Sequence, residues 1–392
     1  MTAKIYLDFN STHPPDKVAL ATGRDFYLTH FANSSGLSLA SQQVFDRIER
    51  AREDIAGLLS VSAQQIIFTS CATESNNLLV REFHSRQKAG PFRVLTSPFE
   101  HPSIAETLKH LDNTEIHAFK AEANGTITAA DLQAVLAQPF DLITLMAAQN
   151  ESGVLLPVLE MMTALGTNHP PVIVDFSQAL PKLCSEDNAP LHPRLVKELT
   201  DRGAYLTATG HKTGAGFGAG LIITPPGHAE LKKTALFAGG NQEFGLRAGS
   251  HNTEAIINLA EALKRKLAAN SFPVWQRVTD EFSAALKSAT APLPGARIIG
   301  EDAPRAPGTI LLLLPQIPID FLIMALDREG ITVSTGTSCK SRSRSPSQAL
   351  IAMGYSEAEA LSVIRISFDQ NLTAAEIART ADVLRNSLAR LT

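Results

Sequence analysis

The sequence predicts an α/β fold in which a large domain with a mostly parallel sheet is joined to a smaller α+β domain in the C-terminal third. Two patterns support this prediction. Over roughly the first 250 residues, short β-branched runs alternate with helical patterns, which is typical of a parallel sheet covered by helices. Beyond that point, longer helices follow with few strands between them. The 392 residues are enough for two or three domains at about 150 residues each.

Five short apolar runs in the first part are predicted to be buried strands, because they are rich in β-branched residues. They are 94–96, 142–145, 172–174, 205–207 and 221–223. A helix is expected around residues 44–58, where apolar residues recur every three or four positions and so share one face. That face comprises Val44, Ile48, Ala51, Ile55 and Leu58.

The C-terminal third is expected to begin with a long helix whose apolar stripe is Ile256, Leu259, Leu263 and Leu267. A strand at 310–314, a helix at 321–327 and a strand at 363–367 should follow. The last helix opens with Thr373, and Glu376 three residues later completes a capping box. Its apolar stripe is Ile377, Ala381, Leu384 and Leu388.

Composition and charge exclude several classes of protein. Hydrophobic residues make up 44 % of the chain and charged residues 19 %, so the sequence is neither disordered nor fibrous. The net charge of −4 gives no basic excess for binding nucleic acid or a membrane surface. No uncharged apolar run approaches the roughly 18 residues of a membrane span, and the first residues lack the apolar segment of a secretory signal. We therefore expect a cytoplasmic protein.

The three cysteines, Cys71, Cys184 and Cys339, are too few and too far apart for a disulfide framework or a zinc site. An odd number leaves at least one thiol unpaired. Cys339 lies in a polar segment beside Lys340 and two nearby arginines, whose positive charges favour its thiolate; those residues could instead keep a surface loop soluble. Cys71 and Cys184 lie in more apolar contexts and are expected to be inert.

Two charged residues follow predicted strands. Lys212 precedes a glycine-rich stretch at 214–218, where the backbone can approach a ligand closely. In a partly desolvated pocket the pKa of such a lysine falls and its amine can form a Schiff base; a solvated surface lysine is the alternative. Asp175 follows the strand at 172–174, at the edge where α/β folds bind ligands. Its carboxylate could keep a pyridinium nitrogen protonated or simply cap a helix.

Three further positions could carry chemistry. Small and hydroxyl residues at 69–77 open a helix, and a helix N-terminus binds phosphate through its free N–H groups; an ordinary helix cap is the alternative. His101 follows another strand and could stack on a planar ring or move protons, although a lone histidine in a loop often does neither. Arg365 lies inside an apolar strand, so if buried it needs an anionic partner such as a substrate carboxylate; an arginine with its head group in water is the alternative.

Together, the order and spacing of these segments resemble the pyridoxal-phosphate-dependent cysteine desulfurases, the NifS/IscS-like branch of the class V aminotransferase superfamily with PLP fold-type I. The resemblance runs nearly end to end. The segments that carry it are 6–8, 11–12, 69–77, 100–101, 149–153, 174–178, 211–212, 239–243, 247–250, 339 with 346–347, and 364–367.

The resemblance implies a role for each matching position. Lys212 is similar to the family's Schiff-base lysine, His101 to its ring-stacking acid/base and Asp175 to the partner of the pyridine nitrogen. Arg365 corresponds to the arginine that binds the substrate carboxylate, and Cys339 to the active-site cysteine. The resemblance also implies that four residues contact the cofactor phosphate: Ala72, Thr73, Thr209 and His211. Gln178 and Asn150 would lie near the phenolic oxygen, with Asn150 also toward the substrate. Ser250 would contact the phosphate bound in the neighbouring subunit.

The implied fold has a large domain at 12–250 built on a seven-stranded sheet. A small domain, formed by 1–11 and 251–392, carries the cysteine segment. The implied activity removes sulfur from L-cysteine, giving L-alanine and a persulfide on Cys339. The position of Ser250 implies a homodimer. The persulfide sulfur would pass to a protein acceptor in iron–sulfur cluster assembly or in tRNA or DNA thiolation, with no direct nucleic-acid contact and no metal.

Four positions depart from the family pattern. Ser38 stands where the family has histidine, Cys71 where it has glycine, Phe217 where it has lysine and Phe244 where it has arginine. None of these changes removes a group that the chemistry requires. Two alternatives stay open: a selenocysteine lyase or another class V lyase or aminotransferase, and a non-catalytic sulfur-carrier paralogue.

Overall fold

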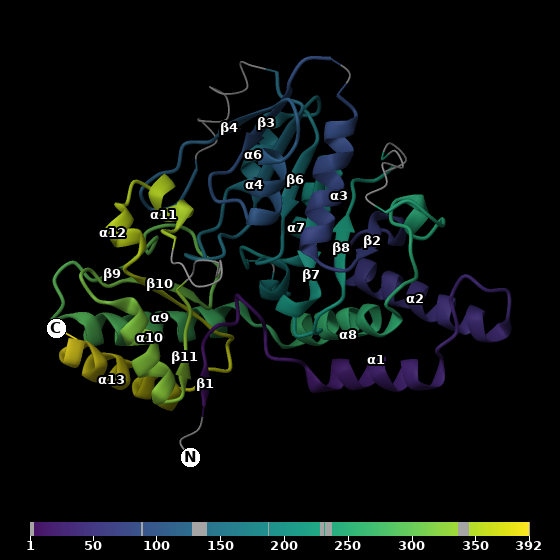
Figure 1. Cartoon of the computed structure of the whole chain (residues 1–392). Coiled ribbons are helices and arrows are strands. Elements are labelled where there is room, and N and C mark those ends of the chain that lie inside the picture. The colour runs from purple at the N-terminus through teal and green to yellow at the C-terminus, as the bar shows by residue number, and fades with distance from the viewer. Residues whose placement is uncertain are drawn as a thin grey trace.

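A central sheet organises the chain (Figure 1). The structure, a computed structural model, describes residues 4–87, 89–127, 139–186, 188–227, 231, 237–335 and 345–391. Within these ranges the largest sheet has seven strands in the order β2-β8-β7-β6-β5-β3-β4. Their bounds are β2 Ile66–Thr69, β3 Phe92–Thr96, β4 Thr114–Ala118, β5 Leu142–Met146, β6 Val172–Asp175, β7 Ala204–Thr209 and β8 Gly220–Ile223.

The predicted mostly parallel sheet is confirmed. The neighbours from β4 to β7 pair in parallel, whereas β8 runs antiparallel to both β7 and β2. All five predicted strands are present, whereas β2 and β4 were not predicted. β4 lies at the sheet edge and is largely exposed and polar, so it has no apolar run to detect. β2 is only four residues long and directly precedes the residues that open a helix.

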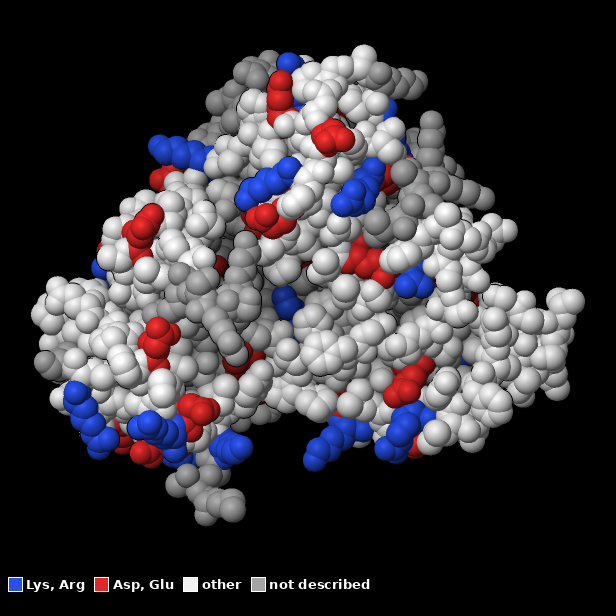
Figure 2. All heavy atoms as spheres, viewed as in Figure 1, with Lys and Arg blue, Asp and Glu red and all other residues white. Residues whose placement is uncertain are grey.

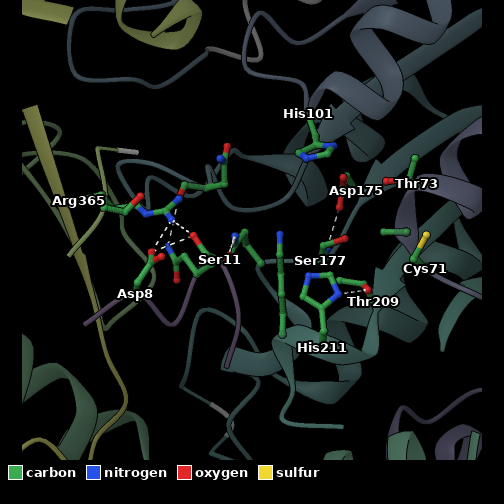
Figure 3. A pocket seen from close by; sticks show the side chains of 16 residues that line it. Asp8, Ser11, Cys71, Thr73, His101, Asp175, Ser177, Thr209, His211 and Arg365 are labelled. Atoms are coloured by element: carbon green, nitrogen blue, oxygen red, sulfur yellow. Dashed lines mark hydrogen bonds and ion pairs between the residues drawn. The ribbon is translucent and has the colours of Figure 1, made fainter. Parts of the chain in front are cut away.

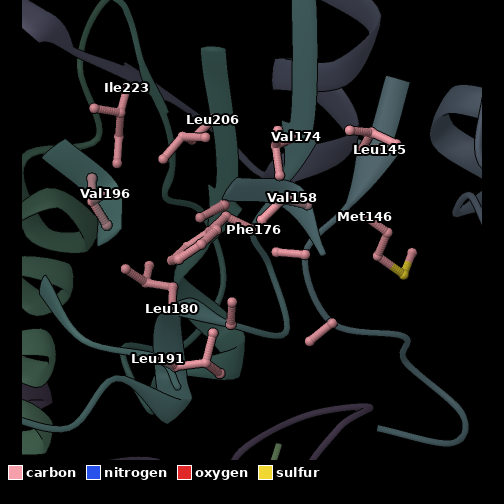
Figure 4. Close-up of a cluster of buried hydrophobic side chains, with 14 of the residues drawn as sticks. Leu145, Met146, Val158, Val174, Phe176, Leu180, Leu191, Val196, Leu206 and Ile223 are labelled. Atoms are coloured by element: carbon pink, nitrogen blue, oxygen red, sulfur yellow. The ribbon is translucent and has the colours of Figure 1, made fainter. Parts of the chain in front are cut away.

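Helices cover both faces of this sheet. Their bounds are α2 Leu39–Leu58, α3 Ala72–Ser85, α4 Pro102–Lys109, α6 Val158–Leu165, α7 Pro193–Asp201 and α8 Thr253–Ala269. Apolar residues of α3 and α4 pack against Ile67, Val94 and Ile173 on one face. Residues of the other four helices pack with neighbours such as Val174 and Leu206 on the opposite face (Figure 4). Alternate residues of each strand therefore enter opposite layers.

The predicted helix face at 44–58 and the stripe beginning at Ile256 both pack into the core of the large sheet. α8 lies side by side with α1 (Lys17–Thr29). Asp16 caps the N-terminus of α1 and forms an ion pair with Arg265 of α8 at 2.8 Å. The sequence pattern changes near residue 250, but α8 belongs to the first core by its packing. We therefore propose that the boundary between the two parts of the chain follows α8.

A second core lies beside the first. Its sheets have the order β12-β10-β9 and β1-β11, and Ile5 and Leu7 of the N-terminal segment pack there with Phe282 and Leu384. The capping box of Thr373 and Glu376 is present. The bounds are β1 Ile5–Tyr6, α9 Phe272–Thr290, β9 Arg297–Ile298, β10 Thr309–Leu313, α10 Ile319–Arg328, β11 Ile331–Thr332, α11 Gln348–Ala352, α12 Glu357–Ala360, β12 Val363–Ser367 and α13 Ala374–Leu391.

None of the helices in the described ranges has both the length and the apolar character needed to cross a membrane.

Candidate active site

A cavity of about 370 Å³ lies where the carboxyl ends of β2, β3, β5, β6 and β7 meet the N-terminal segment and β12. Figure 2 shows a hollow near the centre of the face in view, with a basic side chain at the floor of the hollow. Ten of the predicted site residues line the cavity, together with six that were not assigned a role. The lining residues are Asp8, Asn10, Ser11, Cys71, Ala72, Thr73, His101, Asn150, Asp175, Ser177, Gln178, Thr209, His211, Lys212, Ser334 and Arg365.

Lys212 ends a short 3₁₀ turn, η3 (Gly210–Lys212), which directly follows β7. Gly214 closes this turn with φ = +92°, in the left-handed region that glycine adopts without strain. Burial lowers the pKa of the Lys212 ammonium to about 8; Asp175 opposes this shift and Arg365 adds to it. A substantial fraction of this amine is therefore neutral, and thus nucleophilic, near pH 8.

Asp175 is the last residue of β6 and is almost fully buried. One carboxylate oxygen accepts the N–H of Ser177 at 2.9 Å, and the other accepts the side-chain amide of Asn76 at 3.2 Å. Asn76 is itself buried and accepts the hydroxyl of Thr207 at 2.6 Å. These bonds fix the carboxylate as an acceptor in a low-dielectric wall of the cavity, where it suits a ring N–H.

His101 caps the N-terminus of α4. Its Nδ1 accepts the N–H of Ser103 at 3.1 Å, so the neutral ring carries its proton on Nε2. The Ser103 hydroxyl links this ring to Asn76, whose amide donates to it at 2.9 Å. Burial and the positive charge of Lys212 lower the pKa of His101, while Asp175 acts in the opposite direction. The ring is therefore predominantly neutral at pH 7.

The N-terminus of α3 forms an anion site at the far side of the cavity. Cys71 is its N-cap residue and supplies no side-chain cap, so the first N–H groups, at Ala72 and Thr73, are open to a ligand. A Cβ on Gly220 would lie 2.6 Å from the Cys71 carbonyl carbon, so only glycine lets β8 approach α3 this closely. Cys71 itself lines the cavity, and its expected inertness stays a prediction.

Thr209 and His211 complete this side. The Thr209 hydroxyl lies 2.9 Å from Nδ1 of His211. Burial and the charges of Lys212 and His101 lower the pKa of His211 to about 4, so its ring is neutral at pH 7 and acts as a hydrogen-bonding group.

Arg365 lies on the opposite side of the cavity, with Asp8 and Ser11 (Figure 3). Its Nη2 contacts Asp8 at 2.8 Å and Ser11 at 2.6 Å, and Nη1 donates to the Asn150 carbonyl at 3.0 Å. Its Nε has no hydrogen-bonding partner among the described residues. Arg365 is therefore buried and paired with Asp8, and its two remaining donors, on Nε and Nη1, can serve an anionic ligand.

Two predicted positions are not tested by the described part of the chain. Ser250 is exposed on this chain, so its expected contact across a dimer stays a prediction. Cys339 lies outside the described residues. Its described flanks both reach the site: Ser334 lines the cavity, and the Ser347 hydroxyl donates to Glu151, next to Asn150, at 2.7 Å.

Three of the four departures from the family pattern have simple local explanations. Ser38 caps the N-terminus of α2. Phe217 is exposed and stacks on His211 with ring centroids 5.3 Å apart. Phe244 lies over the guanidinium of Arg52. Cys184, by contrast, is buried, and burial raises the pKa of its thiol to about 12, as expected of an inert cysteine.

Comparison with known proteins gives a consistent picture. The model of the aminotransferase class-V family matches residues 5–380. A cysteine desulfurase of Nostoc sp. (strain PCC 7120 / SAG 25.82 / UTEX 2576) is 28 % identical over 99 % of this chain and 93 % of its own length. A solved NifS-like protein superposes with a TM-score of 0.86 at 27 % identity, covering 99 % of this chain and all of the other. A structure of SspA in complex with cysteine has a TM-score of 0.78 at 25 % identity, over 94 % of this chain and 99 % of the other. The chain belongs to the class-V aminotransferase family, and within it is similar over its whole length to the NifS-like cysteine desulfurases.

Proposed function

We propose that this protein is a pyridoxal-phosphate-dependent L-cysteine desulfurase that forms a persulfide on Cys339. One observation carries the proposal: a buried lysine amine, a fixed carboxylate and an open helix N-terminus line one cavity, with an arginine on its opposite side. The amine can hold the aldehyde carbon of a cofactor, the carboxylate its pyridine nitrogen and the helix N-terminus its phosphate. The arginine can hold the carboxylate of an amino acid.

The cavity fits pyridoxal phosphate by the chemistry of its donors and acceptors. Asp175 accepts from a ring N–H, and Ala72 and Thr73 donate to a phosphate through the α3 N-terminus. Gln178 points its Nε2 to the Asn10 carbonyl at 3.0 Å, which leaves its buried Oε1 without a partner among the described residues. A buried unpaired acceptor is unfavourable, and a donor on a bound ligand would satisfy it. When bound, the cofactor withdraws electrons from the α-carbon of the amino acid.

Lys212, His101 and Arg365 then act on the substrate. Arg365 binds its carboxylate and orients the molecule. The neutral Lys212 amine takes up a proton from the α-carbon, which its lowered pKa permits near neutral pH. His101 would lie against the cofactor ring, and its Nε2–H can donate a proton and afterwards take one back.

Cys339 removes the sulfur. Its thiolate attacks the substrate sulfur; an S–S bond forms, the C–S bond breaks, and the released electron pair returns to the carbon side, which takes up a proton and leaves as alanine. Ser334 lies at the cavity wall, and the five residues from it to Cys339 can span at most about 17 Å. That reach is compatible with attack in the cavity.

We also propose a homodimer, a protein sulfur acceptor and a cytoplasmic location. Large apolar side chains are exposed between α1 and α2, among them Leu28, Phe31, Leu37 and Leu39, which favours burial against a second copy. A dimer would also bring Ser250 to the partner's phosphate site. The reduced thiol that the chemistry needs agrees with a cytoplasmic compartment. The SspA structure with cysteine supports L-cysteine as the substrate.

The test uses purified protein supplied with cofactor. An absorption band near 420 nm that disappears in Lys212→Ala supports Lys212 as the covalent attachment site. Alanine release from L-cysteine should fall at least 100-fold in Cys339→Ala and stay near wild type in Cys184→Ala, a matched control. A protein that stays colourless with added cofactor would refute the enzyme and leave the sulfur-carrier paralogue. Undiminished alanine release by Cys339→Ala would exclude the persulfide step, and a higher kcat/KM with L-selenocysteine would favour the lyase alternative.

A further inference from the structure

A buried lysine behind the cavity is not explained by the proposed chemistry. Lys182 ends the 3₁₀ turn η2 (Leu180–Lys182), four residues after Gln178, and its side chain is almost fully buried. Its Nζ contacts the Thr309 hydroxyl at 2.5 Å and donates to the Pro307 carbonyl at 3.1 Å. No carboxylate among the described residues forms an ion pair with it.

The hydrogen bonds of Lys182 lead directly to the cavity wall. The Thr309 hydroxyl, held by Lys182, accepts the side-chain amide of Asn10 at 3.0 Å. The same amide of Asn10 donates to the Asn150 carbonyl at 3.2 Å, and the backbone carbonyl of Asn10 accepts Nε2 of Gln178. The Asn10 carbonyl therefore fixes the orientation of the Gln178 side-chain amide. It also supports the Asn150 carbonyl, to which Arg365 donates.

The local backbone keeps Thr309 in place for this contact. Gly308, with φ = +74°, lies between the two acceptors of Lys182, and a Cβ there would come within 2.4 Å of Trp275 Nε1. Its N–H donates to Thr279 at 2.9 Å. The acceptors are thus fixed by a turn packed on α9, and Lys182 joins this turn to the wall of the cavity.

Burial of Lys182 without a counter-charge is unfavourable for stability. Desolvation and the positive charges of Arg365, Lys266, Arg305 and Lys212 together lower its pKa to about 7. An apolar side chain of the same length would avoid this cost. Buried groups with strongly shifted pKa values are concentrated at functional sites, and here the hydrogen bonds show which part of the site is affected.

We propose that Lys182 is a positioning residue of the active site, which holds Thr309 and Asn10 so that the Gln178 amide and the Asn150–Arg365 pair keep their places on the cavity wall. The proposal rests on the proposed function, since Gln178 and Arg365 are the groups assigned to cofactor and substrate. It assigns Lys182 no contact with either.

The experiment compares Lys182→Met, Thr309→Val and the double variant in the cofactor-loaded enzyme. Lys266→Met is the matched control, because Lys266 is partly buried, also has a pKa lowered by burial and lies at the same 6.0 Å from the Trp275 ring, but forms none of these hydrogen bonds. We expect Lys182→Met and Thr309→Val each to raise KM for L-cysteine about tenfold and to shift the pH midpoint of the visible cofactor band by at least half a unit.

The double variant should be no worse than the more severe single variant, because both changes break one chain of contacts. Lys266→Met should leave KM and the spectral midpoint unchanged. The proposal is overturned if Lys182→Met behaves like Lys266→Met, or if the two single effects multiply in the double variant. If Lys182→Met fails to fold, Thr309→Val alone tests the proposal. A wild-type KM and a wild-type spectrum in Thr309→Val would then exclude the chain of hydrogen bonds from Lys182 to the cavity wall. The spectral midpoint needs no turnover, so it tests Lys182 even if the wild type proves inactive on L-cysteine.

Discussion

A buried ion pair between Arg52 and Glu243 should stabilise the segment that leads to Ser250. The Glu243 carboxylate receives both terminal nitrogens of Arg52 at 2.8 Å, the N–H of Phe68 at 2.6 Å and Nε2 of His251 at 2.6 Å. Glu243 itself is in the left-handed region, with φ = +50°. Its backbone is therefore strained, and the carboxylate contacts are what hold it.

The size of this stabilisation follows from the carboxylate. The hydrogen bonds and charges of Arg52 and His251 outweigh burial and lower the pKa of Glu243 from 4.5 to about 2. This shift corresponds to about 3 kcal/mol of folding stability above pH 5. Because the folded-state pKa is the lower one, the contribution is present above pH 4.5 and is lost as the pH falls toward 2. At pH 3.5, roughly 40 % of it is gone.

Glu243→Gln should therefore lower the free energy of unfolding by about 3 kcal/mol at pH 7, since the amide loses the charge and directs an NH₂ group at donors. Urea unfolding followed by far-UV circular dichroism measures this change. Glu49→Gln is the matched control: Glu49 also pairs with Arg52, at 3.1 Å, but its side chain is 34 % exposed, so a loss below about 1 kcal/mol is expected. A loss below 1 kcal/mol in Glu243→Gln, or a loss of the same size at pH 3.5 as at pH 7, would show that the charge of this carboxylate does not supply the stabilisation.

Three further predictions concern the cavity. Asn76→Leu should lower kcat at least tenfold, since Asp175 loses a donor; steady-state kinetics that match wild type would exclude this role. Gly220→Ala should weaken cofactor affinity at least tenfold, because the new Cβ displaces the α3 N-terminus from β8; a spectroscopic titration measures it, and an unchanged Kd contradicts it. Lys212→Met should stabilise the apoprotein by roughly 1–3 kcal/mol at pH 7. Because the folded-state pKa of Lys212 is the lower one, this gain should vanish as the pH rises from 8 to 10.5, and a gain independent of pH would show that charge burial is not its cause.

Residues at or shortly after strand ends could be predicted from the sequence, because a short apolar run fixes the strand and the polar residues that follow it lie near the carboxyl edge of the sheet. Lys212, Asp175 and His101 are of this kind, and the structure brings them to one cavity. Arg365 was detectable for another reason, as a charge inside an apolar strand. Ser250 was assigned from the resemblance alone, and its place in the site depends on a second copy of the chain.

The residues that support the site could not be predicted, because their partners are remote in the sequence. Asn76 contacts Asp175 and Thr207 across 99 and 131 positions, and Asn10 contacts Thr309 across 299. No local pattern marks such residues: Asn76 lies within a helix, and Lys182 follows a strand end like many surface lysines. Only the folded topology shows that each has no access to water and a specific polar partner.

The two sides of the cavity are built on different hydrophobic cores, and this has a consequence for catalysis. Lys212, Asp175 and the α3 N-terminus belong to elements packed on the large sheet, whereas Arg365 is on β12, whose apolar residues Ile364 and Ile366 pack in the second core. The distance between the Lys212 amine and the Arg365 guanidinium therefore depends on how the two cores are held together.

Asn10 and Lys182 bridge the two cores beside the cavity, through Thr309 of β10. A displacement of one core by as little as 1 Å would move the substrate carboxylate relative to the reacting carbon, and errors of that size are enough to cost about 100-fold in rate. Polar contacts across the junction thus determine rate as well as stability.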